Sequence, residues 1–494
     1  MIKCTLDNSI FSFSIAEKSL GFCDRWIQVR LGKYYVEVSE RTKIYYHKNG
    51  CNEILIIGIC IDTSTEDKLG LCEKILNNAK SIEDVLEIEY YCGGKYIIFV
   101  KIGNDYYLLG DATCSLPVSY VFHQGCFFAA SYENVLAKKL GLMPDRELVE
   151  IRNSGSVSQA MPYDLTVYAE IKQLLPNHYI DLNRKKIIRF PLMSRKLELS
   201  AKDAAEITNT RILKLLTGYS SMYKLACPIT SGRDSRVVLS YTYTQDNNVH
   251  CYTINHNEFK NNEQDIIIPT RLAETFDLNY NVLVDIEPEK ELVAYADSVF
   301  GKRQYSLRTL MIANTIFGSF GEFAIINGDI IGQIGKCSLH RDIPAVFATP
   351  RYFLCKLHNF NKRSKSLIKN WIEEVRASEE QTSLFDMFSI ESRMGRWAAQ
   401  EKNIYNAIGQ IDLNIFNSRS ILQAWCAVSR KERKDDKIHL ALIENMNREL
   451  LDIPFEKETS LFANVSKRNG VLYLIGSYSK FYFELLKYKF GGKV

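Results

Sequence analysis

The stretch that most constrains this chain is residues 226–240, where an apolar run ends abruptly in small and hydroxyl-bearing residues. A run with the apolar spacing of a helix follows. A buried parallel strand that feeds a helix through such a loop places free backbone N–H groups beside a bound anion. Glycine lets the backbone approach a phosphate, and a carboxylate can bind Mg²⁺. The loop residues are Thr230, Ser231, Gly232, Arg233, Asp234 and Ser235.

The same loop also fits a plain strand-to-helix turn. In that case Ser231 or Asp234 would cap the helix, a role that serine and aspartate often fill. The stretch lacks the G-x-x-x-x-G-K-[ST] pattern of kinase-type P-loops. Chemistry alone therefore leaves two interpretations open, a phosphate loop with a metal-binding Asp234 and a structural turn.

The composition excludes several classes of protein. Of the 494 residues, 46% are hydrophobic and 24% are charged, as in an ordinary soluble globular protein. The 62 basic and 58 acidic residues are interspersed, so no nucleic-acid partner is expected. The 13 cysteines include no C-x-x-C pair and indicate reduced thiols. With no signal-peptide profile and no apolar run longer than 54–61, we expect a cytoplasmic protein without a membrane partner.

Short alternating or β-branched runs, separated by turn signals, occupy the chain up to about residue 191. Many short strands with few helices predict stacked antiparallel sheets. The composition turns basic and polar near residues 189–199, which places a domain boundary between residues 1–195 and residues 200–494. The expected strands are Ile27–Leu31, Tyr34–Val38, 54–61, 96–102 and 106–109, and the expected helices are 66–80 and Glu133–Leu140.

Beyond residue 200, strand-like runs alternate with helical spacing, which predicts an α/β fold with a doubly wound parallel sheet. Ligands of such sheets bind at the carboxyl ends of the strands, so the loops after Ile229 and Ile326 should share one edge. From residue 351 onward the chain is expected to be mostly helical, most clearly at 385–402 and 420–430. The expected strands are 225–229, 249–254, 280–284 and 323–326, with helices at 201–216, 236–244 and 263–276.

The loop at Thr230 to Ser235 resembles the pyrophosphatase loop of the asparagine synthetase family, usually written S-G-G-x-D-S. Several further segments resemble sequence motifs of that family and occur in the same order along the chain. They are 92–96, 109–120, 174–179, 327–333, 436–440 and 450–455. The resemblance implies an N-terminal Ntn-hydrolase-like α+β sandwich of the glutaminase type. It also implies a C-terminal ATP-pyrophosphatase domain, which is adenine nucleotide α-hydrolase-like, with a helical C-terminus. The family includes β-lactam synthetases and lasso-peptide cyclases.

The resemblance also implies roles for individual residues, with ATP and Mg²⁺ as cofactors. Asp234 would bind Mg²⁺, and Asp329 would act as the acid/base residue at its position in the second loop. Lys437 would offset charge on the leaving pyrophosphate. The implied nucleotide-binding residues are Thr230, Ser231, Gly232, Arg233, Asp234, Ser235, Thr253 and Ile254.

The sequence departs from the family pattern at positions that carry the family's chemistry. Active glutaminases of the family expose an N-terminal cysteine, whereas position 2 is Ile2 and Cys4 is internal, so the first domain is expected to be an inactive scaffold. Ser231 replaces the first glycine of the loop. Gly332 stands at the position of the family's second magnesium carboxylate, which is therefore missing, and Gln333 replaces its final glutamate.

These features predict an ATP-dependent, AMP-forming amide synthetase. Its partners would be a small-molecule or peptide carboxylate and either ammonia or an amine, including an amine of the same substrate, and a homodimer is compatible with it. The alternative is a catalytically degenerate relative that serves as a nucleotide-binding or partner subunit. Structural alternatives also stay open for two residues, because Asp329 could cap a turn and Lys437 could lie on a solvated helix end.

Overall fold

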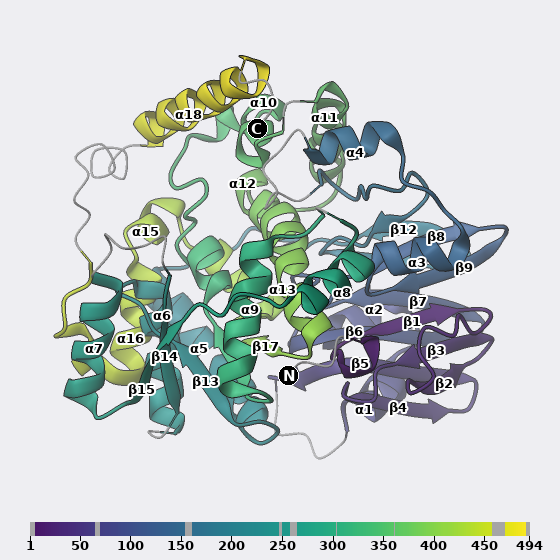
Figure 1. Ribbon diagram of the computed structural model, residues 1–494, viewed down its shortest axis with the longest axis horizontal. Coiled ribbons are helices and arrows are strands. Elements are labelled where there is room, and N and C mark those ends of the chain that lie inside the picture. Colours follow the sequence, from purple (N-terminus) through teal and green to yellow (C-terminus); the bar gives the residue numbers. More distant parts are fainter. Residues whose placement is uncertain are drawn as a thin grey trace.

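The computed structural model describes residues 5–64, 70–153, 161–246, 249–256, 264–302, 304–359, 361–456 and 470–490. Two antiparallel sheets form the N-terminal half, and one parallel sheet with many helices forms the C-terminal half (Figure 1). In Figure 1 the antiparallel strands lie on the right, from purple to blue, and the parallel strands β13, β14 and β15 lie on the left in teal. No helix among the described residues is long and apolar enough to cross a membrane.

Each antiparallel sheet has six strands. The first has the order β10-β8-β9-β1-β3-β2 and the second the order β12-β11-β7-β6-β5-β4. The strands of the first sheet are β1 (Phe13–Ala16), β2 (Ile27–Leu31), β3 (Tyr34–Val38), β8 (Ser119–His123), β9 (Cys126–Ala130) and β10 (Lys172–Gln173). Those of the second are β4 (Ile44–Asn49), β5 (Asn52–Asp62), β6 (Cys92–Ile102), β7 (Asp105–Gly110), β11 (His178–Asp181) and β12 (Lys186–Arg189).

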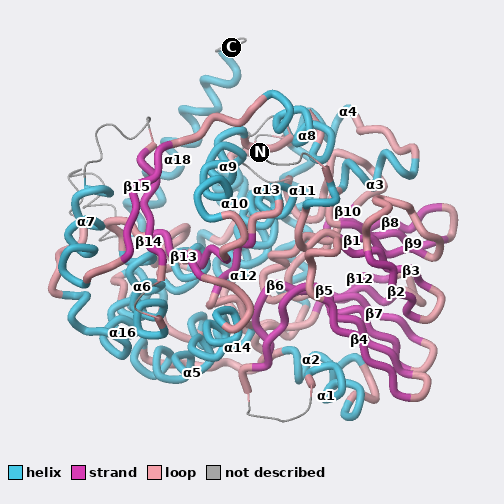
Figure 2. The backbone as a smooth tube through the Cα atoms, turned by 60° about the horizontal axis from the view of Figure 1, so that its bottom comes forward, coloured by secondary structure: helices cyan, strands magenta, loops and turns pink. Residues whose placement is uncertain are grey.

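The alternation of apolar side chains sets how these sheets stack. Val36 of β3 and Ile57 of β5 belong to one buried cluster between the two sheets. The next residue along β5, Ile56, points to the opposite face, because side chains alternate along a strand, and packs with α1 (Leu71–Asn78) and α2 (Ile82–Glu89). Helix α3 (Glu133–Leu140) packs on the outer face of the first sheet. The result is a four-layer helix-sheet-sheet-helix sandwich, whose strands form two groups in Figure 2.

The third sheet is fully parallel and has the order β15-β14-β13-β16-β17. The chain therefore adds β14 and β15 on one side of β13 and then places β16 and β17 on the other side of β13. This reversal is the topological switch point, where the loops after β13 and β16 diverge and leave room for a ligand. The strands are β13 (Leu225–Pro228), β14 (His250–Asn255), β15 (Asn279–Val284), β16 (Ala324–Asn327) and β17 (Ile411–Asn414).

Helices cover both faces of the parallel sheet, as a doubly wound fold requires. Apolar residues of α5 (Ala201–Ser220), α6 (Arg233–Gln245), α7 (Gln264–Phe276) and α16 (Lys437–Asn447) join the cluster that contains Cys227 of β13. Helices α8 (Lys290–Phe300), α9 (Leu307–Phe320) and α13 (Ala399–Ile408) pack with Ala226, the next residue of the same strand. Further elements are α4 (Arg146–Asn153), α10 (Pro350–Leu357), α11 (Lys362–Ala377), α12 (Leu384–Phe388), α14 (Arg419–Cys426), α15 (Arg430–Lys434) and α18 (Gly470–Phe490).

The structure confirms every strand expected from the sequence and most of the helices, with shifts of a few residues at the ends. The expected helix at 66–80 begins at Leu71 and ends at Asn78 among the described residues, and 65–69 lie outside them. The expected helix at 385–402 is divided into α12, the π-helix η5 (Ser389–Ala398) and α13. Strand β17 lies in a region expected to be helical. Ile2 and Cys4 lie outside the described residues.

A buried arginine ties the sandwich to the C-terminal half. The Nε of Arg419, at the start of α14, donates to Oε2 of Glu89 at 2.6 Å. Its Nη1 and Nη2 donate to the side-chain oxygen of Asn177 and the carbonyl of Gly110, both at 3.0 Å. The side chains of Arg419 and Glu89 are 3% and 0% exposed. Every bond of this guanidinium therefore crosses between the two halves of the molecule.

Replacing Arg419 by alanine should destabilise the protein by about 3–5 kcal/mol, because a buried carboxylate loses its cation. Urea denaturation followed by fluorescence measures the loss as a lower midpoint. The matched control is Arg363→Ala, which breaks a pair with Glu147 whose side chains are 43% and 53% exposed. That variant should lose less than about 1 kcal/mol. Equal midpoints for the two variants would contradict this account of the Arg419 contacts.

Candidate functional site

A cavity of about 380 Å³ opens at the carboxyl edge of the parallel sheet. Residues that follow β13, β14 and β16 line it together with residues of α9, α13 and β17, so it lies at the switch point of the sheet. Its volume is in the range of cavities that hold small organic ligands. The lining residues from the strand ends include Ile229, Thr230, Thr253, Ile254, Asn255, Asn327, Asp329 and Asp412.

The walls of this switch-point cavity differ in chemistry. Ile312 and Ile316 of α9, with Ile254 and Tyr252 of β14, supply apolar and aromatic lining. The charged lining residues include Asp329, Lys402 and Asp412. An apolar slot beside a few placed polar groups suits a flat heterocycle that carries a charged substituent.

The predicted phosphate loop connects β13 to α6 at this edge. Gly232 is the N-cap of α6, so the first backbone N–H groups of the helix face the loop without intrahelical partners. The loop is fastened at its ends, where Thr230 N–H donates to Ser235 Oγ at 3.1 Å and the two hydroxyl oxygens lie 3.0 Å apart. Gly232 N–H donates to Thr230 Oγ1 at 3.2 Å. The arrangement is the strand–loop–helix expected from the sequence.

Two carboxylates lie against the donors of Ser231. Its N–H and Oγ donate to Oδ1 of Asp265 at 3.0 and 2.5 Å, and Oγ also lies 3.2 Å from Oε2 of Glu456. Asp265 comes from the first turn of α7, and Glu456 follows the segment 450–455 singled out in the sequence. The Ser231 hydroxyl thus contacts two acidic groups at the place where the sequence predicts a bound phosphate group.

Asp234 faces a histidine across the loop. Its Oδ1 accepts a hydrogen bond from Nε2 of His439 at 2.8 Å, and the His439 side chain is fully buried. Oδ2 of Asp234 occupies the space beside Gly332, where an added Cβ would lie 2.3 Å from that oxygen. The second loop therefore does lie against the first, as expected, but Asp234 fills the place of the side chain that Gly332 lacks.

The surroundings of Asp234 favour the ionised form of its carboxyl group. Burial alone would raise the pKa of its carboxyl group. The hydrogen bond and positive charge of His439, with the charges of Lys336 and Arg233, outweigh that effect and lower the pKa below its usual value. The residues present do not fit a magnesium ion held by two carboxylates, since one carboxylate is hydrogen-bonded to His439 and the other is replaced by Gly332. No cluster of three or more metal-ligating side chains occurs among the described residues.

Asp329 lies in the cavity and is paired with a lysine that the sequence did not single out. Nζ of Lys402, on α13, lies 3.1 Å from Oδ2 of Asp329 and 3.0 Å from Oδ1 of Asp412. Burial alone would lower the pKa of Lys402, but the two carboxylates hold it well above its usual value. The Asp329 side chain is 43% exposed and opens into the cavity. It can therefore meet a ligand while Lys402 holds it in place.

Lys437 is not among the residues that line the cavity. Its side chain is 53% exposed, and Nζ lies 3.3 Å from Glu432. Its neighbours on α16 do face the loop, since His439 contacts Asp234, and Asp436 pairs with Arg233 at 3.3 Å. The role that the resemblance gives Lys437 stays a prediction, and the contacts fit the solvated helix end.

The other predicted nucleotide-binding residues lie where a ligand could reach some of them. Thr253 and Ile254 line the cavity beside Thr230. The hydroxyl of Thr253 is already engaged, because it donates to the Ile229 carbonyl at 2.6 Å and accepts from Tyr280 at 2.9 Å. Its contribution to a ligand would therefore come from the backbone, as expected.

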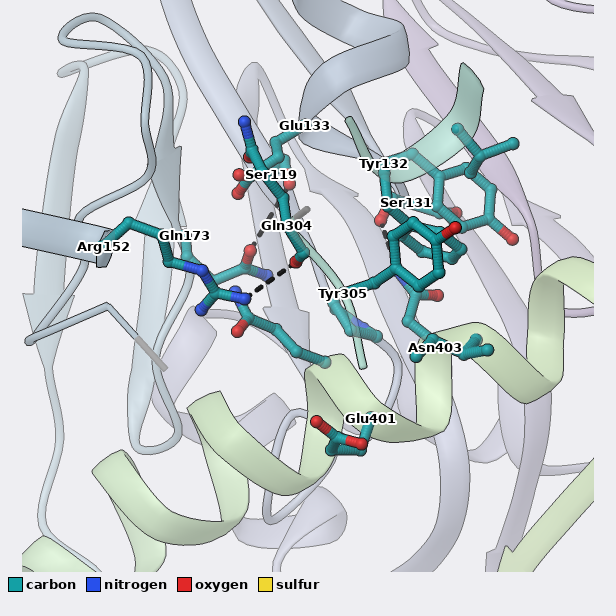
Figure 3. A pocket seen from close by; sticks show the side chains of 15 residues that line it. Ser119, Ser131, Tyr132, Glu133, Arg152, Gln173, Gln304, Tyr305, Glu401 and Asn403 are labelled. Atoms are coloured by element: carbon teal, nitrogen blue, oxygen red, sulfur yellow. Dashed lines mark hydrogen bonds between the residues drawn. The ribbon is translucent and has the colours of Figure 1, made fainter. Parts of the chain in front are cut away.

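A smaller cavity of about 50 Å³ lies between the sandwich and the C-terminal helices (Figure 3). Arg152 reaches across it and donates from Nη2 to the carbonyl of Gln304 at 2.7 Å. Burial raises the pKa of both Glu133 and Glu401, which line it. The predicted site residues lie elsewhere, and the volume is too small for a nucleotide. The switch-point cavity is therefore the better candidate.

Sequence reasoning missed several groups at this edge. Lys402 and Asp412 come from α13 and β17, and β17 lies within a region where the sequence predicts mostly helices. His439 lies two residues beyond Lys437 and belongs to no motif that points to Asp234. Asp265 and Glu456 carry no motif. Only the predicted edge of the sheet, and no local spacing, could have pointed to them.

Comparisons with known proteins add little to this geometry. No protein-family model matches the sequence, and no curated protein matches it significantly. A solved structure of glutamine phosphoribosylpyrophosphate (PRPP) amidotransferase from B. subtilis, complexed with ADP and GMP, aligns at 9% identity with a TM-score of 0.24, over 68% of this chain and 72% of that chain. A structure of the allosteric regulatory enzyme of purine biosynthesis aligns at 9% identity with a TM-score of 0.25, over 72% and 73%. Similarity this slight does not assign a fold or a function.

Removing the Ser231 hydroxyl should open the loop to phosphate. In Ser231→Gly the hydroxyl contacts with Asp265 and Glu456 are lost, at about 0.5–1.5 kcal/mol for a hydrogen bond, while the backbone N–H at position 231 still donates to Asp265. Pyrophosphate should then bind about 2- to 10-fold more tightly, as measured by isothermal titration calorimetry. The control is Ser221→Gly, at the C-cap of α5 near the amino end of β13. Unchanged pyrophosphate binding in Ser231→Gly would show that the carboxylates do not compete with phosphate.

Proposed function

We propose that this protein is an ATP-dependent, AMP-forming amide synthetase. It would adenylate a carboxylate and transfer the acyl group to ammonia or an amine. The observation that carries the proposal is the switch-point cavity, which joins an apolar slot at β14 to the loop that begins α6. The resemblance of Thr230 to Ser235 to the asparagine synthetase loop supports the same reaction class.

The four-layer sandwich supports the proposal from the other half of the chain. Its helix-sheet-sheet-helix architecture is the layering expected of an Ntn-hydrolase-like, glutaminase-type domain. We propose that it acts as a scaffold for the C-terminal half, to which Arg419 ties it through buried hydrogen bonds. The nitrogen would then come from free ammonia, a separate amine or an amine of the substrate itself.

The proposed reaction has two steps. A carboxylate oxygen of the substrate attacks the α-phosphorus of ATP, and the bond to pyrophosphate breaks. The amine nitrogen then attacks the acyl carbon, AMP leaves, and a proton passes from the nitrogen to a base. Asp329 is the base in this scheme, because its carboxylate opens into the cavity and Lys402 holds it in place at 3.1 Å. The N-terminal amides of α6 stabilise the charge of the leaving pyrophosphate.

A second candidate is a nucleotide-binding partner subunit without catalysis. The specific observation in its favour is the pairing of Asp234 with His439 beside Gly332, which leaves no second carboxylate at the loop. The contact of Asp265 and Glu456 with Ser231 points the same way. In this case the cavity would still bind a nucleotide, while pyrophosphate would not be released.

The test is release of pyrophosphate and AMP, in equal amounts, from ATP with a panel of carboxylates and amines. Asp329→Asn should lower the turnover by about 10²- to 10⁴-fold, the usual loss when a general base is removed. Asp105→Asn, at the exposed tip of the β6–β7 hairpin, is the matched control and should leave turnover unchanged. ATP binding without pyrophosphate release for any pair of substrates would favour the partner subunit. Full activity in Asp329→Asn would remove that residue from the mechanism.

A further inference from the structure

The carboxylates at the carboxyl edge of the parallel sheet already form ion pairs or hydrogen bonds with other side chains of the protein. Asp234 accepts from His439, as described above. Lys402 forms ion pairs with both Asp329 and Asp412. Asp436, at the start of α16, also has two cations beside it. Its Oδ1 lies 3.0 Å from Nζ of Lys336, and its Oδ2 lies 3.3 Å from Nη1 of Arg233.

The space around Asp234 is closed to a second ligand from the neighbouring loop. Gly332 lies in the π-helix η3 (Ile331–Gly335), and any side chain there would meet Oδ2 of Asp234. His439 is fully buried on the other side. A metal ion at Asp234, whose side chain is 45% exposed, would find one carboxylate oxygen bonded to His439 and no carboxylate at position 332. Mg²⁺ in proteins is usually bound through one or two carboxylates together with substrate phosphates, so a single carboxylate that is already hydrogen-bonded offers it little without the nucleotide.

The other pair of carboxylates is blocked by a fixed charge. The ammonium of Lys402 lies between Asp329 and Asp412, where a divalent ion bridging the two would have to sit. The Lys402 side chain also lies over the ring of Tyr405, with Nζ 5.1 Å from the ring centre. Because removing this lysine from its partners would leave buried charges uncompensated, exchange for a metal ion is unfavourable.

We propose that this protein binds its nucleotide without a magnesium ion held by the chain. This inference rests on the proposed function for the identity of the ligand. It differs from what the resemblance implies, which is a magnesium ion on Asp234. The ligand class is a nucleotide bound through the backbone amides at the start of α6 and the lining of the switch-point cavity, with any magnesium bound only to its phosphates.

Metal binding can be tested without any nucleotide. Mn²⁺, which favours oxygen ligands as Mg²⁺ does, is titrated into the protein, and the free ion is followed by electron paramagnetic resonance. We expect the same free Mn²⁺ signal for the wild type and for Asp234→Asn. A Mn²⁺ site that is present in the wild type and lost in Asp234→Asn would overturn the proposal.

Nucleotide binding is then compared with and without the metal. Isothermal titration calorimetry with ATP, in Mg²⁺ and in EDTA, should give dissociation constants within about threefold of each other. Binding that weakens more than about tenfold in EDTA would overturn the proposal. Failure of ATP to bind in either buffer would instead overturn the proposed function, while the Mn²⁺ titration would still decide whether the chain holds a metal.

A gain-of-site variant gives the converse result. Gly332→Asp combined with His439→Ala restores the missing carboxylate and frees Asp234 to move toward it. We expect Mn²⁺ binding to appear in this double variant, whereas His439→Ala alone should lack it. A double variant that folds, as shown by its circular dichroism spectrum, and binds no more Mn²⁺ than the wild type would contradict the assignment of these two positions. If the double variant does not fold, the two experiments above decide the question.

Discussion

The ammonium of Lys402, held between two carboxylates, is the interaction on which the carboxyl edge of the parallel sheet depends. Asp412 binds Lys402 and also accepts from Nδ2 of Asn327 at 3.0 and 3.1 Å. Oδ1 of Asn327 in turn accepts from Nδ2 of Asn414 at 2.6 Å and from the backbone N–H of Asp329 at 3.3 Å. The strands β16 and β17 thus end in a polar network in which one lysine pairs with both carboxylates. Without that lysine, the buried Asp412 would lose its cation, which is strongly unfavourable, and the partly exposed Asp329 would lose the group that positions it.

This network also explains why the sandwich remains part of the molecule. Lys95 of β6 donates from Nζ to Asn406 of α13 at 2.7 Å and lies 3.4 Å from the carbonyl of Asp412. Burial lowers the pKa of Lys95 to about 8, so the group is held in a dry interface. Together with the bonds of Arg419, these contacts fix α13 and β17 from the side of the sandwich. The sandwich thus helps to position α13, the helix that carries Lys402.

The sequence predicted the architecture well and the site only in part, for a physical reason. Strand and helix patterns are local, so the alternation after residue 200 and the abrupt loop after Ile229 were enough to place the doubly wound sheet and its active edge. The partners of each carboxylate are set by tertiary packing. Nothing in the spacing shows that His439 meets Asp234, which is 205 positions away, or that Lys402 of α13 reaches Asp329. Strands β13 and β16 are as short as β17 but lie where strand-like runs alternate with helices, whereas β17 stands among helices and lacks that context.

Two small substitutions in the paired loops account for the difference between the expected phosphate site and the observed one. Gly332 removes a carboxylate and leaves a space, and Asp234 fills that space while His439 binds its other oxygen. Ser231 adds a hydroxyl, which draws two further carboxylates onto the loop. Both changes put oxygen atoms of the chain where phosphate and metal would otherwise meet. A nucleotide that binds here must therefore compete with carboxylates for the loop, while the cavity beside β14 remains open to its base. The balance between these two effects decides whether this edge of the sheet carries out chemistry or only recognition.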